Sequence, residues 1–137
     1  MAAELLLDTG PLVALLDADQ ESHQRCVDFF HGWRRPVVTT EAVVTEATHL
    51  LSADSRGRAR CVEFIVSGGA MVIQGGMARL QRVLALLRKY ADVPMDYADA
   101  TLVALAEELG TPEVFTLDRR GFAAYRWRGR RPFHVHP

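Results

Sequence analysis

The chain has 137 residues, of which 49% are hydrophobic and 24% are charged, and its formal net charge is −1. These are the values of an ordinary globular protein, and the length suits one core, so we expect a single domain over residues 1–137. No apolar stretch approaches the ~20 residues of a membrane-spanning helix, and the first residues lack the basic start of a signal peptide, which predicts a cytoplasmic protein without membrane contact.

Short apolar runs alternate with longer amphipathic segments along the chain. The first run, 5–8, predicts a strand, and Gly10-Pro11 then begins a helix because proline is tolerated in the first helical turn. Further strands are predicted over 36–40, 70–74, 114–117 and, as a possible edge strand, 132–135. Helices are predicted over 20–33, 41–52, 56–67, 77–90 and 96–109, with a short turn over 119–124. This alternation predicts a three-layer α/β/α fold with a central parallel sheet of four to five short strands.

Four acidic residues fall where this pattern places one rim of the sheet. Asp8 and Asp118 directly follow predicted strands, Asp99 opens the helix 96–109, and Glu46 lies within the helix 41–52. Ligands of open α/β sheets bind at the carboxyl ends of the strands. Four converging carboxylates would repel one another unless a cation were bound, and Mg²⁺ or Mn²⁺ suits an all-oxygen site. The pattern therefore predicts a divalent metal site.

Each of these acids also has a purely structural explanation. Asp8 and Asp118 suit the capping of a following helix or turn, and Asp96 and Asp99 have the spacing of a capping box. Glu46 would also be acceptable as a solvated helix residue. The combination of two strand-end acids, one acid at a helix start and one in mid-helix favours a carboxylate cluster.

Glu41 is the alternative to Glu46 within the same helix. The two lie five residues apart and so do not share a face by the usual spacing of three or four. Glu41 suits the first turn, where the helix dipole favours an acid. Glu46 has hydrophobic neighbours on both sides, and the spacing alone leaves the choice between the two open.

Four segments of the sequence resemble the blocks of the PIN-domain family, in the family's order and over almost the whole chain. They are residues 5–12 (LLLDTGPL), 45–47 (TEA), 97–104 (YADATLVA) and 115–118 (FTLD). The chain's size also resembles the free-standing VapC-type toxins of type II toxin–antitoxin pairs. The resemblance implies a PIN-like fold and a metal-dependent endoribonuclease. It also implies a small antitoxin protein as partner, and a homodimer.

The resemblance places the catalytic and metal-binding roles on Asp8, Glu46, Asp99 and Asp118, with Mg²⁺ as cofactor and Mn²⁺ as its substitute. Asp96, one helical turn before Asp99, resembles a further acid of many relatives, and capping remains an equal alternative for it. In such a site a metal-activated water attacks the phosphorus, and no protein residue forms a covalent intermediate.

Two threonines are candidates for a supporting role around these carboxylates. Thr9 and Thr116 each lie next to or near a predicted ligand and would orient a carboxylate, a water or the phosphate. Threonines at strand ends and turns also occur for structural reasons alone. Both explanations stay open.

The end of the chain is basic, because residues 119–137 hold six of the 16 basic residues and none of the 17 acids. Arg119 and Arg120 directly follow Asp118 and are candidates for contact with an RNA backbone. Tyr125, Trp127 and Phe133 lie among the arginines and would stack exposed bases. A solvated charged run, or a docking patch for an acidic partner, explains the arginines equally well.

Two other functions compete with the nuclease. One is a PIN-like domain that binds RNA or a partner without cutting. The other is a phosphatase with Asp8 as aspartyl nucleophile, although Gly10 stands where a second acid is wanted and Lys89 is the only lysine. The triplet Asp8-Thr9-Gly10 also matches the aspartic proteases, whose β-rich fold the helical pattern disfavours.

Overall fold

A central sheet of five parallel strands organises the chain in the computed structural model, which describes residues 3–137. The strand order is β3-β2-β1-β4-β5, so β1 is central, and its Leu6 is in register with Val38 of β2 and Val114 of β4. The strands are β1 (Leu5–Leu7), β2 (Val37–Thr39), β3 (Met71–Val72), β4 (Glu113–Phe115) and β5 (His134–His136).

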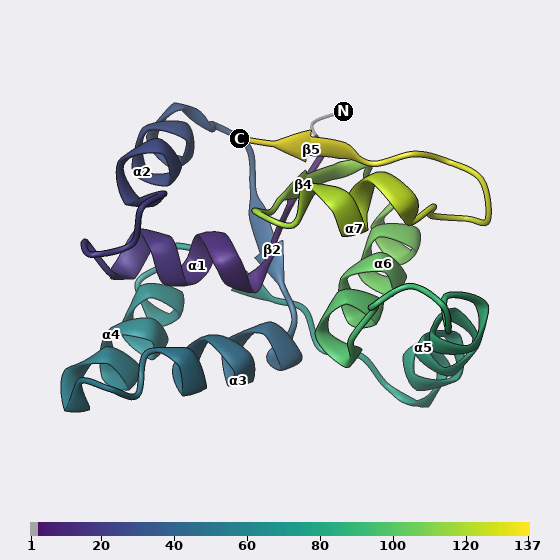
Figure 1. Ribbon diagram of the computed structural model, residues 1–137, viewed down its shortest axis with the longest axis horizontal. Coiled ribbons are helices and arrows are strands. Elements are labelled where there is room, and N and C mark those ends of the chain that lie inside the picture. The colour runs from purple at the N-terminus through teal and green to yellow at the C-terminus, as the bar shows by residue number, and fades with distance from the viewer. Residues whose placement is uncertain (1–2) are drawn as a thin grey trace.

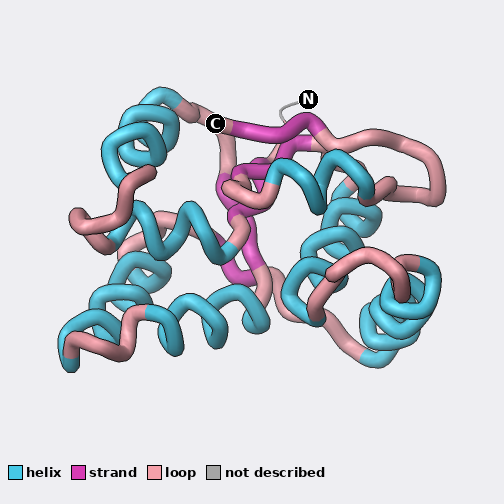
Figure 2. The backbone as a smooth tube through the Cα atoms, viewed as in Figure 1, coloured by secondary structure: helices cyan, strands magenta, loops and turns pink. Residues whose placement is uncertain are grey.

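Helices cover both faces of this sheet. They are α1 (Thr9–Leu16), α2 (His23–Gly32), α3 (Glu41–Leu50), α4 (Ser55–Val66), α5 (Met77–Lys89), α6 (Tyr97–Leu109) and α7 (Arg119–Ala124). Figure 1 shows α1 to α4 on one side of the strands and α5, α6 and α7 on the other. In Figure 2 the strands form a narrow layer between the two groups of helices. The predicted three-layer fold with a parallel sheet is confirmed.

Strand β1 and helix α6 form the centre of the core. Leu5, Leu6 and Leu7 are all fully buried, as expected for a parallel strand that is covered on both faces. Nine consecutive residues of α6, from Ala98 to Ala106, are buried as well, so this helix is enclosed almost all round. Helix α6 ends at Gly110, whose φ of 68° lies in the left-handed region that glycine adopts without strain.

The sequence pattern was wrong about residues 119–124, which form the short helix α7 and not a turn. The Asp118 side chain accepts a hydrogen bond from the Gly121 backbone, and the Phe122 side chain is fully buried. Six residues containing a glycine give too weak a periodic signal for a helix, so the cap and the buried ring decide the structure.

Other predicted elements differ from the structure only in extent. Strand β3 has two residues, where five were predicted, and β5 begins two residues later than expected. Cys26 and Cys61 are both buried and unpaired. Among residues 3–137, no helix has the length and apolar character needed to cross a membrane.

Candidate active site

A cavity of about 590 Å³ lies at the carboxyl ends of β1 and β4. All five acids singled out in the sequence line it: Asp8, Glu46, Asp96, Asp99 and Asp118. Its remaining walls are Thr9, Gly10, Leu50, Pro94 and Leu117. The fold thus brings acids from four distant segments of the chain to one place.

The aspartates of this cavity also cap helices. Asp8 Oδ1 accepts from the Thr9 backbone N–H at 2.8 Å at the start of α1, and Asp118 Oδ1 accepts from the Gly121 N–H at 3.0 Å in α7. Asp96 and Asp99 form a full capping box at the start of α6, with distances of 2.8 and 3.1 Å. The same aspartates therefore both cap helices and line the cavity. Capping brings their carboxylates to helix amino termini, where the helix dipole favours negative charge.

Thr116 ties Asp8 to the backbone beside Asp118. Its hydroxyl donates to Asp8 Oδ2 at 2.7 Å, and its Oγ1 accepts from the Asp118 N–H at 2.9 Å. The side chain is fully buried, so this bridge is shielded from water. Thr116 thus orients a carboxylate, one of the roles considered for it.

The Thr9 hydroxyl is different, because it is buried and finds no hydrogen-bond partner among residues 3–137. Thr9 lines the carboxylate cavity through the same stretch of chain that carries Asp8. Buried polar groups are nearly always paired, so an unpaired hydroxyl at a cavity wall is available to a water or to a bound oxyanion.

Tyr125, which the sequence suggested only as a ring for stacking bases, contacts a carboxylate of the site. Its hydroxyl donates to Asp99 Oδ2 at 3.3 Å, and its ring is fully buried against Tyr90 and Phe122, with centroid distances of 5.3 and 5.1 Å. The contact joins residues 26 apart in the chain, so no local pattern reveals it. Packing of the ring fixes where the hydroxyl meets the carboxylate.

Gly121 is the second residue that the sequence analysis did not single out. A Cβ atom at this position would lie 2.3 Å from Asp118 Oδ2, much closer than any real contact. The absence of a side chain therefore lets the Asp118 carboxylate lie against the backbone of α7. A glycine three residues after a capping aspartate was the available signal in the sequence.

Burial raises the pKa of two of the carboxyl groups. The pKa of Asp8 rises from 3.8 to about 6, chiefly because burial disfavours the charged form, with repulsion from Asp96 and Glu46 adding to the effect and hydrogen bonds from Thr116 and Thr9 opposing it. The pKa of Asp99 rises to about 7, again mainly through burial and further through repulsion by other acids of the cavity. The site thus concentrates negative charge in a poorly solvated place.

Burial also raises the pKa of the Tyr125 phenol above its usual range, and the nearby Asp99 carboxylate adds to this shift. The phenol therefore keeps its proton at neutral pH. It can act on Asp99 only as a hydrogen-bond donor.

The oxygen-only donor set of the cavity fits a hard divalent cation that keeps part of its water shell. Within residues 3–137, no three histidine, cysteine, aspartate or glutamate side chains stand close enough to enclose an ion by themselves. Mg²⁺ in proteins is commonly held by one or two carboxylates and several waters, which such spacing allows. The free hydroxyl of Thr9 and the mutual repulsion of the acids both fit a bound cation with its waters.

Glu46 and Glu41 occupy different places along α3. Glu46 is half-buried and lines the carboxylate cavity, whereas the exposed Glu41 lies at a separate cavity nearer the start of the helix. Of the two glutamates, Glu46 is therefore the one that the fold brings to the aspartates.

The basic end of the chain contributes no wall to the carboxylate cavity. Arg119 and Arg120 are both exposed at the start of α7, directly after Asp118, and the Arg119 guanidinium donates to the carbonyl of Pro137. The two arginines thus lie beside the site in the chain and remain open to solvent.

The aromatic residues among these arginines cannot stack exposed bases, contrary to the expectation from the sequence. Tyr125, Trp127 and Phe133 are 0%, 5% and 8% exposed. The guanidinium groups of Arg128 and Arg131 lie over the Trp127 ring, at 5.4 and 5.3 Å from its centroid. An alternation of arginine and aromatic residues here packs the rings inward and leaves the charges outside.

The family model of the PIN domain matches residues 5–128. Ribonuclease VapC26 of Mycobacterium tuberculosis is 30% identical over 135 residues, which are 97% of this chain and 100% of that protein. The crystal structure of VapC20 from M. tuberculosis, described as a toxin that cleaves the sarcin–ricin loop, superposes with a TM-score of 0.81 at 20% identity, covering 88% of this chain and 94% of the other.

Two toxin–antitoxin structures share the fold. A complex from Klebsiella pneumoniae gives a TM-score of 0.66 at 17% identity, with 90% of this chain and 92% of the other covered. The complex VapBC2 of Rickettsia felis, bound to a DNA fragment from its promoter, gives 0.70 at 11% identity, with 98% and 99% covered. From the family match and the full-length relative, the chain belongs to the PIN-domain family.

Proposed function

We propose that this protein is a VapC-type endoribonuclease that depends on Mg²⁺, or on Mn²⁺ in its place, and is the toxin of a toxin–antitoxin pair. The observation that carries the proposal is the cavity lined by Asp8, Glu46, Asp96, Asp99 and Asp118 in a PIN domain. The 30% identity to a ribonuclease over nearly the whole chain supports the same activity.

Different residues of the cavity have different roles in this proposed reaction. A divalent cation held there supplies a water of lowered pKa and neutralises charge on the scissile phosphate. Thr116 and Tyr125 hydrogen-bond to the Oδ2 atoms of Asp8 and Asp99 and so fix the orientation of these two carboxylates at the cavity. The Thr9 hydroxyl donates to a phosphate oxygen or to the attacking water.

Glu46 and Asp96 line the same cavity and accept hydrogen bonds from the waters between phosphate and protein. Asp118, held on the backbone of α7, lines it as well. No side chain acts as a covalent nucleophile in this scheme. An aspartyl phosphatase would instead use an Asp8 oxygen as its nucleophile.

The decisive experiment compares RNA cleavage by the wild type and by the Asp8→Asn and Asp99→Asn variants, with Mg²⁺, with Mn²⁺ and with a chelator. We expect cleavage by the wild type with either cation, none with the chelator, and at least a ~100-fold loss in both variants. Asp92→Asn, at an exposed position, is the matched control. A wild type that binds RNA without cutting it would identify a binding domain, and full cleavage by both variants would refute the site assignment.

Arg119 and Arg120 are proposed to contact the RNA backbone. Both are exposed and follow the capping Asp118, so their charges lie beside the acidic cavity. The affinity for RNA should fall with rising salt, and the double change to alanine should reduce the slope of that dependence by about one to two. If the affinity and its salt dependence are both unaltered, the two arginines do not contact RNA, and a protein partner is the remaining explanation for them.

An antitoxin is the proposed protein partner, because two structures with this fold are toxin–antitoxin complexes. A small protein encoded beside this chain should form a complex with it and suppress the cleavage of RNA. Co-expression followed by size-exclusion chromatography and a cleavage assay tests this. A neighbouring protein that neither binds nor inhibits would limit the proposal to a solitary nuclease.

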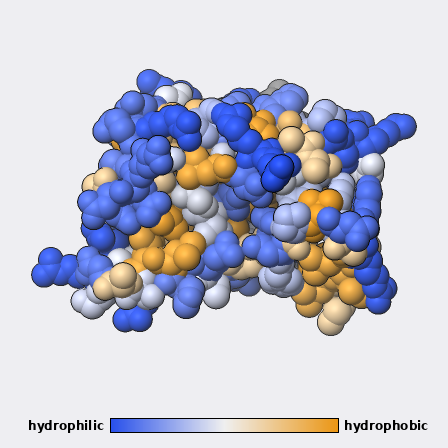
Figure 3. Space-filling view, in the orientation of Figure 1, coloured by the Kyte–Doolittle hydropathy of each residue, from blue (hydrophilic) through white to orange (hydrophobic). Residues whose placement is uncertain are grey.

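A homodimer is proposed from the exposed apolar side chains of α5. Met77, Leu80 and Leu84 follow the helical spacing of three and four and are 69%, 45% and 49% exposed. Orange surface gathers in the region of α5 in Figure 3. Sedimentation analysis should give a dimer for the wild type and a monomer for Leu80→Glu/Leu84→Glu, while a monomeric wild type would refute the dimer.

A further inference from the structure

A groove leads away from the carboxylate cavity between α3 and α6. A cavity of about 520 Å³ shares Glu46 and Asp96 with the carboxylate cavity, and a third cavity of about 340 Å³ shares Ala42, Thr45 and Tyr97 with the second. We call the second and third cavities together the α3–α6 groove. A chain bound at the carboxylates can continue into it without leaving the protein surface.

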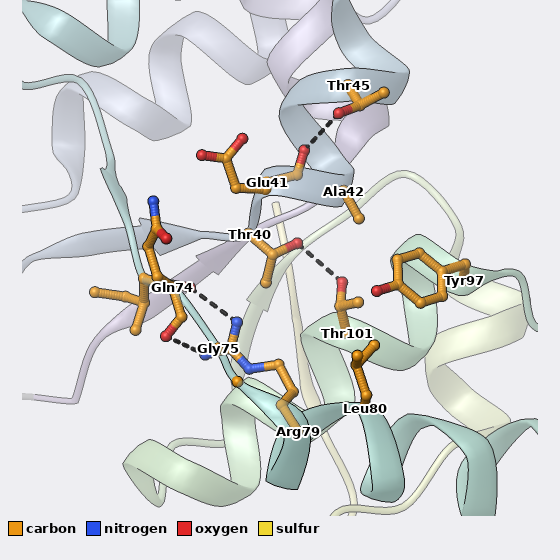
Figure 4. A pocket seen from close by; sticks show the side chains of 12 residues that line it. Thr40, Glu41, Ala42, Thr45, Gln74, Gly75, Arg79, Leu80, Tyr97 and Thr101 are labelled. Atoms are coloured by element: carbon orange, nitrogen blue, oxygen red, sulfur yellow. Dashed lines mark hydrogen bonds between the residues drawn. The ribbon is translucent and has the colours of Figure 1, made fainter.

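Thr40 and Thr101 form the floor at the far end of the groove, and Figure 4 shows the hydrogen bond between them. The Thr101 hydroxyl donates to the Ala98 carbonyl at 2.7 Å, so the 2.9 Å contact between Thr40 and Thr101 is donated by Thr40. Thr40 Oγ1 in turn accepts from the Val43 N–H at the start of α3. Both hydroxyls are occupied, and the floor is rigid.

One wall of the far end is fixed by Arg79. Its guanidinium donates to the carbonyls of Ile73 and Gln74 and makes a bidentate ion pair with Glu108 at 2.7 and 2.8 Å. Gly75 permits this packing, because a Cβ there would lie 2.4 Å from Arg79 Nε. These contacts of Arg79 hold the 73–76 loop in place. Because Glu108 already pairs with the Arg79 charge, Arg79 is not free to bind a phosphate at this end of the groove.

At the far end of the groove, three polar side chains remain free for a ligand. Glu41 and Gln74 are exposed, Tyr97 is 50% exposed, and none of the three side chains hydrogen-bonds to other described residues. In Figure 4 Tyr97 stands at one side of the pocket, with Glu41 and Gln74 across from it. An aromatic ring, an acceptor carboxylate and an amide suit a nucleobase, whereas Glu41 and Glu46 repel a phosphate.

The separation of Glu41 and Glu46 along α3 corresponds to a few nucleotides of a bound RNA strand. Glu41 precedes Glu46 by five residues, which is about 7.5 Å along the helix axis. A stacked strand advances about 3.4 Å per nucleotide, so the two glutamates are on the order of two nucleotides apart.

We propose, on the basis of the nuclease function above, that the α3–α6 groove binds one unpaired RNA base about two nucleotides from the scissile phosphate, and that this base is guanine. The base stacks on Tyr97. The two oxygens of Glu41 accept from the adjacent N1–H and N2–H₂ groups, which guanine alone of the four bases presents side by side. The Gln74 amide donates to the guanine O6 atom. These residues determine the cleavage sequence.

The test is the cleavage profile of a single-stranded RNA pool with randomised positions, read by sequencing the product ends. The wild type should enrich guanine at one fixed position near the cut. Tyr97→Ala should lose the enrichment, and in a cleavage-silent Asp8→Asn background it should bind the RNA about 10-fold or more weakly, since stacking is lost. Tyr97→Phe keeps the ring and should keep both properties.

Glu41→Gln should shift the enriched base from guanine to adenine, because an amide presents one donor and one acceptor, as the edge of adenine requires. Glu63→Gln, an exposed change of the same kind on α4, should leave the profile unaltered.

A wild-type profile without a preferred base at any position, or an unchanged profile in both Tyr97→Ala and Glu41→Gln, overturns the inference and leaves the nuclease intact. An unchanged profile in Tyr97→Ala with weakened antitoxin binding also overturns it and makes the groove a protein interface. If the wild type cuts no RNA with either cation, the proposed function itself fails, and the inference fails with it.

Discussion

Replacing Asp8 by asparagine should stabilise the metal-free protein at neutral pH, although it destroys the proposed site. Asparagine caps a helix about as well as aspartate and can still accept the Thr9 N–H bond. On the other side its amide would donate to Thr116, where the aspartate accepted. The main change is therefore the loss of a buried negative charge.

The size of the effect follows from the pKa of Asp8, which rises from 3.8 to about 6 in the folded protein. A raised carboxyl pKa means that the folded state holds the proton more tightly than the unfolded state, so stability falls as pH rises from about 4 to about 6 and stays low above that. At about 1.36 kcal/mol per pH unit, the cost at pH 7.5 is about 3 kcal/mol. Asp8→Asn removes this cost.

The assay is urea unfolding, followed by circular dichroism, of wild type and Asp8→Asn at pH 4 and pH 7.5 with a chelator present. The variant should be more stable by about 3 kcal/mol at pH 7.5 and about equal at pH 4, where the wild-type carboxyl is largely protonated too. Added Mg²⁺ should stabilise the wild type at pH 7.5 and the variant much less, by mass action. Asp54→Asn, at the exposed cap of α4, is the control and should change stability by less than about 0.5 kcal/mol.

The difference between the two proteins is the quantity to watch, because carboxyl groups that do not interact with Asp8 titrate in the same range and cancel in it. Asp99 does not cancel, since loss of the Asp8 charge lowers the pKa of Asp99 and adds to the stability of the variant. If Asp8→Asn is less stable than the wild type at pH 7.5 without metal, Asp8 carries no burial cost. A stability difference that is the same at both pH values would refute the reasoning in the same way.

Three further changes test contacts around the site and at the surface. Tyr125→Phe removes the hydroxyl that holds Asp99 and should weaken Mn²⁺ binding, measured by calorimetric titration, about 5-fold or more with the fold intact. Gly121→Ala drives a methyl group into the Asp118 carboxylate and should lower the rate of RNA cleavage about 10-fold or more. Glu107→Gln weakens the ion pair with Arg82 of α5 and the hydrogen bond from the Arg128 backbone N–H in the loop after α7, and should lower the free energy of unfolding in urea by about 1–3 kcal/mol.

Each of these changes has a matched control. Tyr90→Phe removes the hydroxyl of the ring that packs on Tyr125 and touches no carboxylate, so Mn²⁺ affinity should persist. Gly32→Ala adds a methyl group with nothing within 4 Å and should leave cleavage unaltered. Glu63→Gln should leave stability within about 0.5 kcal/mol of wild type. A control that matches its test variant would show that the contact in question has no special role.

The order of strands and helices could be predicted because it depends on local periodicity. The runs at Leu5–Leu7 and Glu113–Phe115 gave both the strands and the acids that follow them. That these acids lie close together could also be predicted, since parallel strands end at one edge of the sheet. Their catalytic and metal-binding roles stay predictions until cleavage is measured.

What could not be predicted depends on contacts between distant segments. Tyr125 reaches Asp99 only because α7 packs beside α6, and the burial of Trp127 depends on a loop that folds back on itself. The choice between Glu41 and Glu46 was a question of helix phase, which packing of α3 against α1 and α6 decides. Local sequence constrains none of these contacts.

The double duty of the aspartates affects how this protein could evolve. A descendant that no longer cut RNA would still be under selection to keep a capping side chain at positions 8 and 118 and the capping box of Asp96 and Asp99, although asparagine would serve at position 8. Glu46 caps nothing, so it would be free to drift as soon as catalysis ceased to matter. Among related chains, capping side chains at these positions thus report only that the fold is kept, and the residue at position 46 is the better record of whether a lineage still depends on the chemistry.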